Sequence, residues 1–381
     1  MIFRILEDRL AETAREQQEA DRRFMQLALT LGRRGLGRTW PNPAVGAVVV
    51  KDGLIVGRGW TRPGGRPHAE PEALRRAGRS ARGATLYVTL EPCSHVGKSP
   101  PCTDAVIASG IARVVAAIGD PNPEVAGQGF AKLRAAGIAV DIGLEAAQAA
   151  RDHAGHLRRV RDGRPHVILK LAVSADDKIG GPGGKPVAIT GEAARSRVHL
   201  LRAQCDAILV GIGTVLADDP LLTCRLPGMA ARSPVRVVLD RALRIPLAGR
   251  LVQSARETPL WVMTSETAEA AVAAPLEAAG AQVIRVAGAT PDIDLQAVLH
   301  LLAERGVTRL MVEGGSRVAA AFVAAGLVDE AWLLRGPEAI GNDGVSALGA
   351  LPLSALAQSP NLPVRASETL GKDTLTIYER A

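Results

Sequence analysis

The residues with the clearest chemical potential in this sequence are a histidine and two cysteines. His68 is followed two positions later by Glu70, and eight residues separate Cys93 from Cys102. One imidazole and two thiolates can hold a zinc ion and leave a fourth position for water, which is typical of catalytic rather than structural zinc. A carboxylate beside that water can carry its protons. The spacing therefore predicts a hydrolytic zinc centre with His68, Cys93 and Cys102 as ligands and Glu70 as the catalytic residue.

Ordinary structural roles compete with this interpretation for each residue alone, because free cysteines and hydrogen-bonded histidines are common in protein cores. Their order and context together favour zinc, since His-x-Glu followed by Pro-Cys and a second Cys is the signature of enzymes that deaminate bases and nucleosides. A structural zinc protein with a sugar-nucleotide-binding partner domain is an alternative. It requires a fourth protein ligand, and His95 is the nearby spare.

Length and composition narrow the class of protein. The 381 residues suit two domains, and the aromatic share of 3% leaves little for stacking on bases. The net charge of +7 comes from 46 basic and 39 acidic residues that are mostly interspersed, which favours a solvated surface or a phosphorylated small substrate over nucleic acid. Four cysteines are too few for a disulfide scaffold and suit the cytoplasm. We expect a homo-oligomer without nucleic-acid or membrane partners.

The elements that must position the zinc ligands alternate between helix and strand. Residues 1–20 carry charges throughout and predict a short helical extension, after which Asp21 is expected to cap a helix over 22–31. The pattern in 21–148 predicts an α/β/α sandwich. His68 and Cys102 then stand at helix starts and Cys93 follows a strand. The expected strands and hairpin lie at 45–57, 84–90, 113–118 and 138–140, and the later helices at 102–110 and 127–136.

A polar, basic stretch over 149–165 is expected to be a linker that begins as a helix. His153, His156 and the following His166 invite a metal interpretation. Their irregular spacing and lack of thiol or carboxylate partners favour a solvated helix instead.

The second half, 166–381, again alternates and predicts an α/β domain. Near-continuous apolar strands are expected at 167–174, 206–211, 235–240, 260–264 and 309–313. The last runs into Gly314-Gly315-Ser316 and a helix, which is either a phosphate-binding turn or a tight turn without a ligand. The first strand lacks a following Gly-x-Gly-x-x-Gly, so an ordinary Rossmann dinucleotide site is disfavoured.

Several motifs together resemble the bifunctional deaminase-reductase family of riboflavin biosynthesis, over about Asp21 to the C-terminus. Those of the first half are Trp40-Pro41-Asn42-Pro43, His68-Ala69-Glu70, Leu90-Glu91-Pro92-Cys93-Ser94-His95, Gly97-Lys98-Ser99-Pro100-Pro101-Cys102 and Asp120-Pro121-Asn122-Pro123. Those of the second half are Lys170-Leu171-Ala172-Val173-Ser174, Asp206-Ala207-Ile208-Leu209-Val210-Gly211, the run from Thr214 to Thr223, and Val312-Glu313-Gly314-Gly315-Ser316.

The resemblance implies a zinc-dependent, cytidine-deaminase-like domain followed by a dihydrofolate-reductase-like domain that uses NADPH. It implies that the substrate is a diaminohydroxypyrimidine with a phosphoribosylamino group. Asn42 would hold the pyrimidine, and Lys98 would meet the phosphate. The residues implied for the cofactor are Ala172, Thr214, Asp218, Gly314, Gly315 and Ser316, and those implied for the reductase substrate are Arg202, Leu222, Arg225 and Glu313.

The chain departs from the family pattern in places. Pro71 stands where Val is usual, Ser99 where Thr is usual and Asp177 where Gly is usual, and an aromatic residue is missing near Ala188. The last two changes are expected to reshape the nicotinamide side of the reductase pocket. The choice between NADPH and NADH stays open, because Arg241 and Arg244 are candidates for a 2′-phosphate but also read as surface arginines.

A rival interpretation keeps the zinc centre and changes its target. In that case the first domain deaminates a base in RNA and the second is a binding module. This rival predicts tight, salt-dependent RNA binding.

Overall fold

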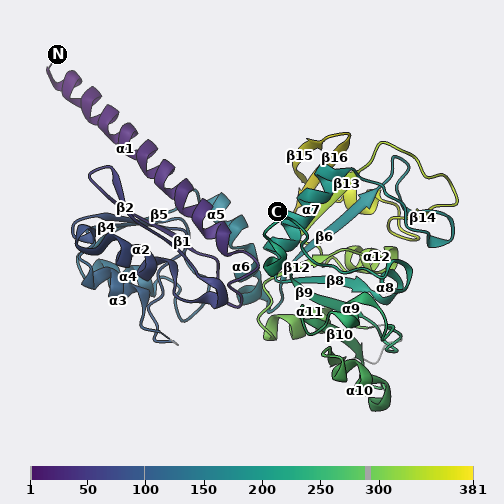
Figure 1. The fold of residues 1–381 in the computed structure, drawn as a ribbon. Helices are drawn as coiled ribbons and strands as arrows, with labels where there is room; N and C mark the ends of the chain where they lie inside the picture. Colours follow the sequence, from purple (N-terminus) through teal and green to yellow (C-terminus); the bar gives the residue numbers. More distant parts are fainter. Residues whose placement is uncertain (1, 98, 288–292, 381) are drawn as a thin grey trace. The chain divides into compact units, whose positions relative to one another are not determined.

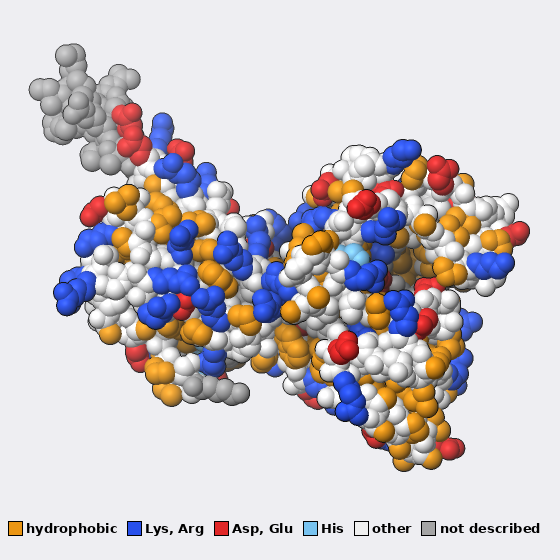
Figure 2. Space-filling model, in the orientation of Figure 1, with side chains coloured by type: hydrophobic (Ala, Val, Ile, Leu, Met, Phe, Trp, Pro, Cys, Tyr) orange, Lys and Arg blue, Asp and Glu red, His pale blue; other side chains and the backbone are white. Residues whose placement is uncertain are grey.

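The computed structural model describes residues 2–97, 99–287 and 293–380, and it separates into two compact units, Met1–Asp162 and Gly163–Ala381 (Figure 1). Each unit has its own sheet and its own hydrophobic core. On the face drawn in Figure 2, Lys and Arg side chains are spread over both units with Asp and Glu among them. In the described part of the chain, no helix combines the length and apolarity needed to cross a bilayer.

The sheet of the first unit has the strand order β2-β1-β3-β4-β5. An antiparallel hairpin, which the sequence predicted within 45–57, joins β1 to β2 through Asp52 and Gly53, and β3, β4 and β5 run parallel to one another. The strands are β1 Gly46–Lys51, β2 Leu54–Trp60, β3 Thr85–Val88, β4 Arg113–Ala116 and β5 Ala139–Ile142. The helices are α1 Ile2–Gly32, α2 Ala69–Ala77, α3 Cys102–Ala108, α4 Gln128–Ala135, α5 Ala146–Asp152 and α6 Ala154–Asp162.

Both faces of this sheet are buried, as the predicted sandwich requires. Ala47 and Val49 of β1 pack with α2, α3 and α4 on one face. Val48 and Val50, which point the other way because side chains alternate along a strand, pack with α1 and α5. The first unit is therefore an α/β/α sandwich.

The predicted cap at Asp21 is wrong. A single helix, α1, runs from Ile2 to Gly32, so Asp21 lies in its interior, and the helix expected for the N-terminal stretch continues into the one expected over 22–31. The Asp21 carboxylate is buried, where it accepts hydrogen bonds from Arg113 Nη2 at 2.7 Å and from Tyr87 Oη at 2.5 Å. These partners satisfy the carboxylate, and Asp21 ties α1 to β3 and β4 instead of starting the helix.

The sequence suggested a solvated helix for the linker histidines, but the structure buries His153 and largely covers His156. His153 is 2% exposed and its Nε2 lies 3.0 Å from Thr89 Oγ1, beyond the end of β3. His156 Nε2 lies 3.0 Å from Asp120 Oδ1. Helices α5 and α6 therefore pack onto the first unit through buried hydrogen bonds that the sequence pattern did not reveal.

The sheet of the second unit has the order β11-β10-β9-β8-β12-β6-β13-β16-β15. Each strand from β11 across to β13 in this order runs parallel to its neighbours. Strands β16 and β15 follow at the edge beyond β13 and pair antiparallel. Its strands are β6 His166–Val173, β8 Ala207–Gly211, β9 Val235–Leu239, β10 Leu260–Ser265, β11 Gln282–Val286, β12 Arg309–Val312, β13 Glu330–Arg335, β15 Val364–Leu370 and β16 Asp373–Glu379. Strands β7 Lys178–Gly180 and β14 Val345–Ser346 pair separately as a small antiparallel sheet.

Helices cover this second sheet as well. They are α7 Glu192–Gln204, α8 Ile212–Asp218, α9 Arg250–Gln253, α10 Ala270–Ala278, α11 Leu295–Glu304, α12 Ser316–Ala324 and α13 Ser354–Ala357. Ile168 of β6 belongs to a core shared with α7 to α10, and its neighbours Val167 and Leu169 are fully buried too. The carboxyl ends of β6, β8 and β12, three neighbouring parallel strands, carry most of the residues predicted for the reductase.

Candidate active sites

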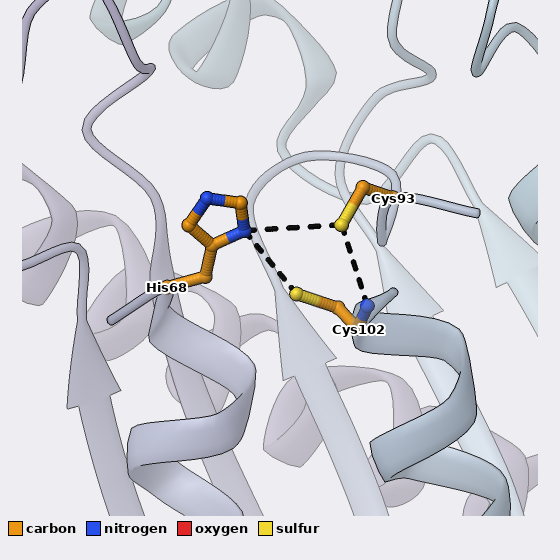
Figure 3. A group of neighbouring side chains, drawn as sticks. All are labelled: His68, Cys93 and Cys102. Carbon is orange, nitrogen blue, oxygen red and sulfur yellow. Dashed lines mark hydrogen bonds between the residues drawn. The ribbon is translucent and has the colours of Figure 1, made fainter. Parts of the chain in front are cut away.

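The three predicted zinc ligands converge in the first unit (Figure 3). His68 caps the start of α2, Cys102 is the first residue of α3, and Cys93 lies in the loop between β3 and α3. His68 Nδ1 lies 3.3 Å from Cys102 Sγ and 3.8 Å from Cys93 Sγ. The Cys102 amide also donates to Cys93 Sγ at 3.3 Å. The sheet thus brings two helix starts and one loop to a common point.

The donor set fits a zinc ion. Ligand atoms bound to one tetrahedral zinc at about 2.0–2.3 Å lie roughly 3.5–3.8 Å apart, close to the two measured nitrogen–sulfur distances. All three donor atoms lie within 4.8 Å of one another. Among the described residues the group contains no fourth protein donor, and His95 is not part of it. One coordination position therefore stays free for water, which argues against a structural zinc site.

The charges of the cluster also favour a cation. A hydrogen bond from the Cys102 thiol, with a further one from His68, lowers the pKa of Cys93 to about 4 despite burial. The same contact raises the pKa of Cys102, because one shared proton cannot leave both sulfurs. A bound metal ion would replace that proton and allow both cysteines to be thiolates.

Glu70 lies in the first turn of α2 and is 3% exposed. Burial raises the pKa of Glu70 to about 7, while the charge of His68 opposes the rise. A hydrogen bond with Cys102 holds the carboxyl beside the cluster. The side chain is thus placed to exchange a proton at the metal site.

Glu91 is a residue whose role the sequence did not reveal. It precedes Cys93 by two positions and is 4% exposed. Its carboxylate accepts backbone hydrogen bonds of 3.1–3.3 Å from Asp120, Gly127 and Phe130. This clamp ties the loop that carries Cys93 to the start of α4, so Glu91 positions a predicted metal ligand and is not itself one of the converging donors.

The two residues predicted to bind the deaminase substrate differ in what the structure shows. Asn42 is half-buried, and its Nδ2 donates to the Gly65 carbonyl at 2.9 Å, close to the loop that leads to His68. Lys98 lies outside the described residues, so its contact with a phosphate stays a prediction. A cavity of about 570 Å³ borders the cluster and has His68 and Cys102 in its wall.

The turn after β12 in the second unit meets the start of α8. The Gly315 amide donates to Thr214 Oγ1 at 2.9 Å, and Gly211 donates to the Gly314 carbonyl at 3.2 Å. A Cβ added at Gly315 would lie 3.0 Å from Thr214 Oγ1, so only glycine fits this approach comfortably. Ser316 Oγ donates to the Ser346 carbonyl at 2.8 Å. Four predicted cofactor residues are thus neighbours, namely Thr214, Gly314, Gly315 and Ser316.

The residues predicted for the reductase substrate also meet, together with a lysine that the sequence did not single out. Glu313 Oε2 lies 2.7 Å from Arg202 Nη2, and Oε1 lies 3.2 Å from Lys170 Nζ. Burial alone would raise the pKa of Glu313, but the charges of Arg202 and Lys170 lower it to about 2. The available signal for Lys170 was a lone charge within the apolar run of β6.

Four predicted residues of the second unit remain, two for the reductase substrate and two for the cofactor. Leu222 is buried with a φ of 56°, and the following Arg225 is exposed, with its amide 3.4 Å from His199 Nδ1. Burial and the positive charges of Arg202 and Arg250 lower the pKa of Arg225. Ala172 lies in β6, and Asp218 is exposed at the end of α8.

The departure at Asp177 has a structural partner. Asp177 has a φ of 64°, in the left-handed region where glycine is usual, and its Oδ1 lies 2.7 Å from Arg335 Nη1. Arg335 also donates to the carbonyls of Ser174 and Ala175 at 3.1 Å. The turn that the family usually builds with glycine is held here by an ion pair. Ala188, the other departure, is exposed between β7 and α7.

We expect Asp177→Gly to be tolerated and Asp177→Ala to be harmful. Glycine relieves the left-handed strain while an exposed ion pair is lost, whereas alanine loses the pair and keeps about 1–2 kcal/mol of strain. Urea unfolding of both variants beside the unsubstituted protein measures the difference. Equal stability of the alanine and glycine variants would contradict this account.

The second unit is expected to lose stability below pH 4.5. The pKa of Glu313 and that of Glu330 are both about 2, below their ordinary value of 4.5, because His166 beside Glu330 acts against burial as Arg202 does beside Glu313. Groups with a depressed pKa stabilise the fold fully above 4.5 and lose that contribution as the pH falls toward 2. Urea unfolding between pH 6 and 3 tests this, and Glu330→Gln should flatten the dependence.

Comparison with known proteins agrees with this geometry. Residues 18–118 match the family described as the cytidine and deoxycytidylate deaminase zinc-binding region, and residues 165–376 match the RibD C-terminal domain. The riboflavin biosynthesis protein RibD of Aquifex aeolicus is 41% identical over 363 residues, which cover 95% of this chain and 99% of that protein. RibD of Escherichia coli is 42% identical over 93% of this chain and 97% of its own.

The chain belongs to the RibD family. Solved RibD structures agree: one from Acinetobacter baumannii has a TM-score of 0.85 at 35% identity, covering 96% of this chain and 99% of the other. The Thermotoga maritima protein described as a diaminohydroxyphosphoribosylaminopyrimidine deaminase/5-amino-6-(5-phosphoribosylamino)uracil reductase has a TM-score of 0.84 at 36% identity, covering 96% of this chain and all of the other.

RibD membership confirms the expected fold class and the bifunctional character of the enzyme, a deaminase and reductase of riboflavin biosynthesis. It disfavours the RNA-deaminase rival, because the second half matches a RibD reductase domain rather than an RNA-binding module. The roles of individual site residues stay predictions.

Proposed function

We propose that the first unit deaminates a diaminohydroxypyrimidine carrying a phosphoribosylamino group and that the second unit reduces the ribosyl group of the product to ribityl with NADPH. The observation that carries the proposal is the convergence of His68, Cys93 and Cys102 beside the buried carboxyl of Glu70. The name of the Thermotoga relative supports both steps, because it gives the pyrimidine as the substrate of a deaminase and 5-amino-6-(5-phosphoribosylamino)uracil as the substrate of a reductase.

In the deaminase, His68, Cys93 and Cys102 would hold zinc. Zinc, when bound, lowers the pKa of a water molecule enough for attack on the ring carbon at neutral pH. Glu70 takes the proton from the attacking water and passes it to the departing amine, since a carboxyl with a raised pKa can act in both directions. Asn42 orients the pyrimidine, and Lys98 meets the phosphate.

In the reductase, the residues after β8 and β12 would hold the cofactor: Thr214, Asp218 and the Gly314 to Ser316 turn, with Ala172 nearby. NADPH, when bound, supplies the hydride for C1′ of the sugar. Arg202, Leu222, Arg225 and Glu313 face the ribosyl phosphate, and we add Lys170 to this group. Its ammonium, 3.2 Å from Glu313, can donate a proton or hydrogen bond to the opening sugar.

The two activities can be separated in one experiment. The pyrimidine substrate is supplied to the purified protein with either NADPH or NADH, and ammonia and cofactor oxidation are followed independently. The proposal expects ammonia without any cofactor, and oxidation of NADPH only after deamination. A protein that releases no ammonia would contradict it.

Removal of the metal should abolish deamination and leave reduction intact. A chelator strong enough to extract zinc is expected to stop ammonia release, because the metal-binding donors lie in the first unit. Oxidation of NADPH with the deaminated substrate should persist. Added zinc should restore ammonia release, and parallel loss of both activities would argue against two independent sites.

We further propose a cytoplasmic location. The described cysteines are free, and the paired thiols of the deaminase site must stay reduced to bind metal.

A further inference from the structure

The cavity beside the metal cluster has an arginine in its wall. The cavity of about 570 Å³ is lined by Arg66, His68, Ser99, Cys102 and Asp104 together with several prolines and alanines. Pro67 and Pro71 add apolar surface on the same wall. A ligand that reaches the metal donors His68 and Cys102 through this cavity therefore passes the guanidinium of Arg66.

The charge of Arg66 is not balanced within the cavity. Asp104, the acid in the wall, lies 2.5 Å from Lys132 Nζ and is neutralised by it. Among the side chains that the structure describes, no carboxylate forms an ion pair with Arg66. Its Nη1 donates to Ser99 Oγ, a neutral partner that leaves the positive charge available. Arg66 thus brings a positive charge, unpaired among the described residues, into a cavity whose wall is otherwise largely apolar.

The imidazole of His95 lies near Arg66 as well. A Cβ built on Gly97 would lie 3.8 Å from Arg66 Nη2 and 3.6 Å from His95 Nε2, so the two side chains flank Gly97. Gly97 lies in the loop between the two cysteine ligands. Asn42 Nδ2 donates a hydrogen bond of 2.9 Å to the carbonyl of Gly65, which fixes the backbone next to Arg66. Arg66 therefore lies between the residue predicted to orient the pyrimidine and the loop that carries the metal ligands.

We propose that Arg66 is a specificity-determining residue that binds the phosphate of the deaminase substrate. The inference rests on the proposed function, because it takes the metal cluster and Glu70 as the place where the pyrimidine reacts. A guanidinium pairs two N–H groups with two phosphate oxygens, which gives both affinity and orientation. The phosphate displaces or joins Ser99 as the partner of Arg66, and the pyrimidine then points toward the metal donors.

The test compares two substrates on the same variants. Ammonia release is measured with the phosphorylated pyrimidine and with the same compound after removal of its phosphate. Arg66→Gln is expected to lower kcat/KM for the phosphorylated substrate by about 10- to 100-fold, mainly through KM, because one charged hydrogen-bonding partner is lost. For the phosphate-free substrate we expect a change of less than about 3-fold. Arg66→Lys should restore part of the preference.

Two controls separate binding from folding. Arg79→Gln removes an exposed arginine from the same unit and should leave both substrates unaffected. Zinc content should be unchanged in Arg66→Gln. Inorganic phosphate should inhibit the unsubstituted protein in competition with the substrate and should inhibit Arg66→Gln more weakly.

The outcomes are distinct. An equal loss for both substrates would overturn the proposal and show that Arg66 supports the loop through Ser99. No loss for either would also overturn it and place the phosphate elsewhere, while the proposed deamination itself would stand. If the unsubstituted protein released no ammonia from either compound, both the proposed function and the role of Arg66 would fall.

Discussion

Replacing Glu70 with Gln is expected to stop ammonia release while leaving reduction intact. Glutamine keeps the shape of the buried side chain but cannot take up and return a proton, so deamination should fall by about 10²- to 10⁴-fold. Zinc content should be unchanged, because Glu70 is not one of the converging donors. Oxidation of NADPH with deaminated substrate should proceed at the unsubstituted rate. The measurements are an ammonia assay, metal analysis and cofactor absorbance on one preparation.

The matched control is Glu124→Gln, an exposed carboxylate in the same unit. It should leave both activities as they are. Retention of more than about a tenth of the ammonia release in Glu70→Gln would remove Glu70 from the role of proton carrier. Loss of both activities together would count against two separate sites.

Replacing Glu313 with Gln is expected to produce the opposite pattern, with reduction lost and deamination kept. The neutral side chain leaves Lys170 and Arg202 largely buried without their shared counter-charge. Removing one partner of such a buried group costs about 3 kcal/mol or more of unfolding free energy. We expect NADPH oxidation to fall by about 10²-fold or more, since orientation of the substrate by this group is lost.

A second substitution separates stability from function. Lys170→Gln combined with Glu313→Gln removes one unpaired charge, so urea unfolding should show partial recovery of stability. Reduction should stay low, because the ammonium near the sugar is gone as well. Glu368→Gln, whose side chain is 50% exposed beside Arg197, is the control and should change neither quantity. Recovery of reduction in the double variant would contradict a direct role for Lys170 and Glu313.

The metal site could be predicted from the sequence because its signals are local. His68 and Cys102 start helices and Cys93 follows a strand, and the hydrophobic pattern locates all three boundaries within a few residues. The parallel arrangement of β3 and β4 then leaves little choice about where the ligands meet. Functional residues at the ends of helices and strands can therefore be located from the sequence pattern alone.

Contacts between distant segments could not be predicted in the same way. Lys170 meets Glu313 across 143 residues of chain, because β6 and β12 are neighbours in the sheet. Asp21 before an amphipathic run has the pattern of a helix cap, and only its partner Arg113, 92 residues away, shows why an acid stands in the middle of a helix. In both cases the sequence shows an isolated charge but not its counter-ion.

His153, between α5 and α6, and His156 of α6 determine where the chain can be divided if the two catalytic halves are expressed separately. A deaminase fragment that ended at residue 148 would lack His153 and His156, leaving Thr89 and Asp120 without these partners. Thr89 and Asp120 flank the loop that begins with Glu91 and supplies Cys93. A cut after Asp162, where the first compact unit ends, keeps these hydrogen bonds within the fragment. Residues 149–162, which the sequence suggested as part of a linker, thus belong to the folded deaminase unit.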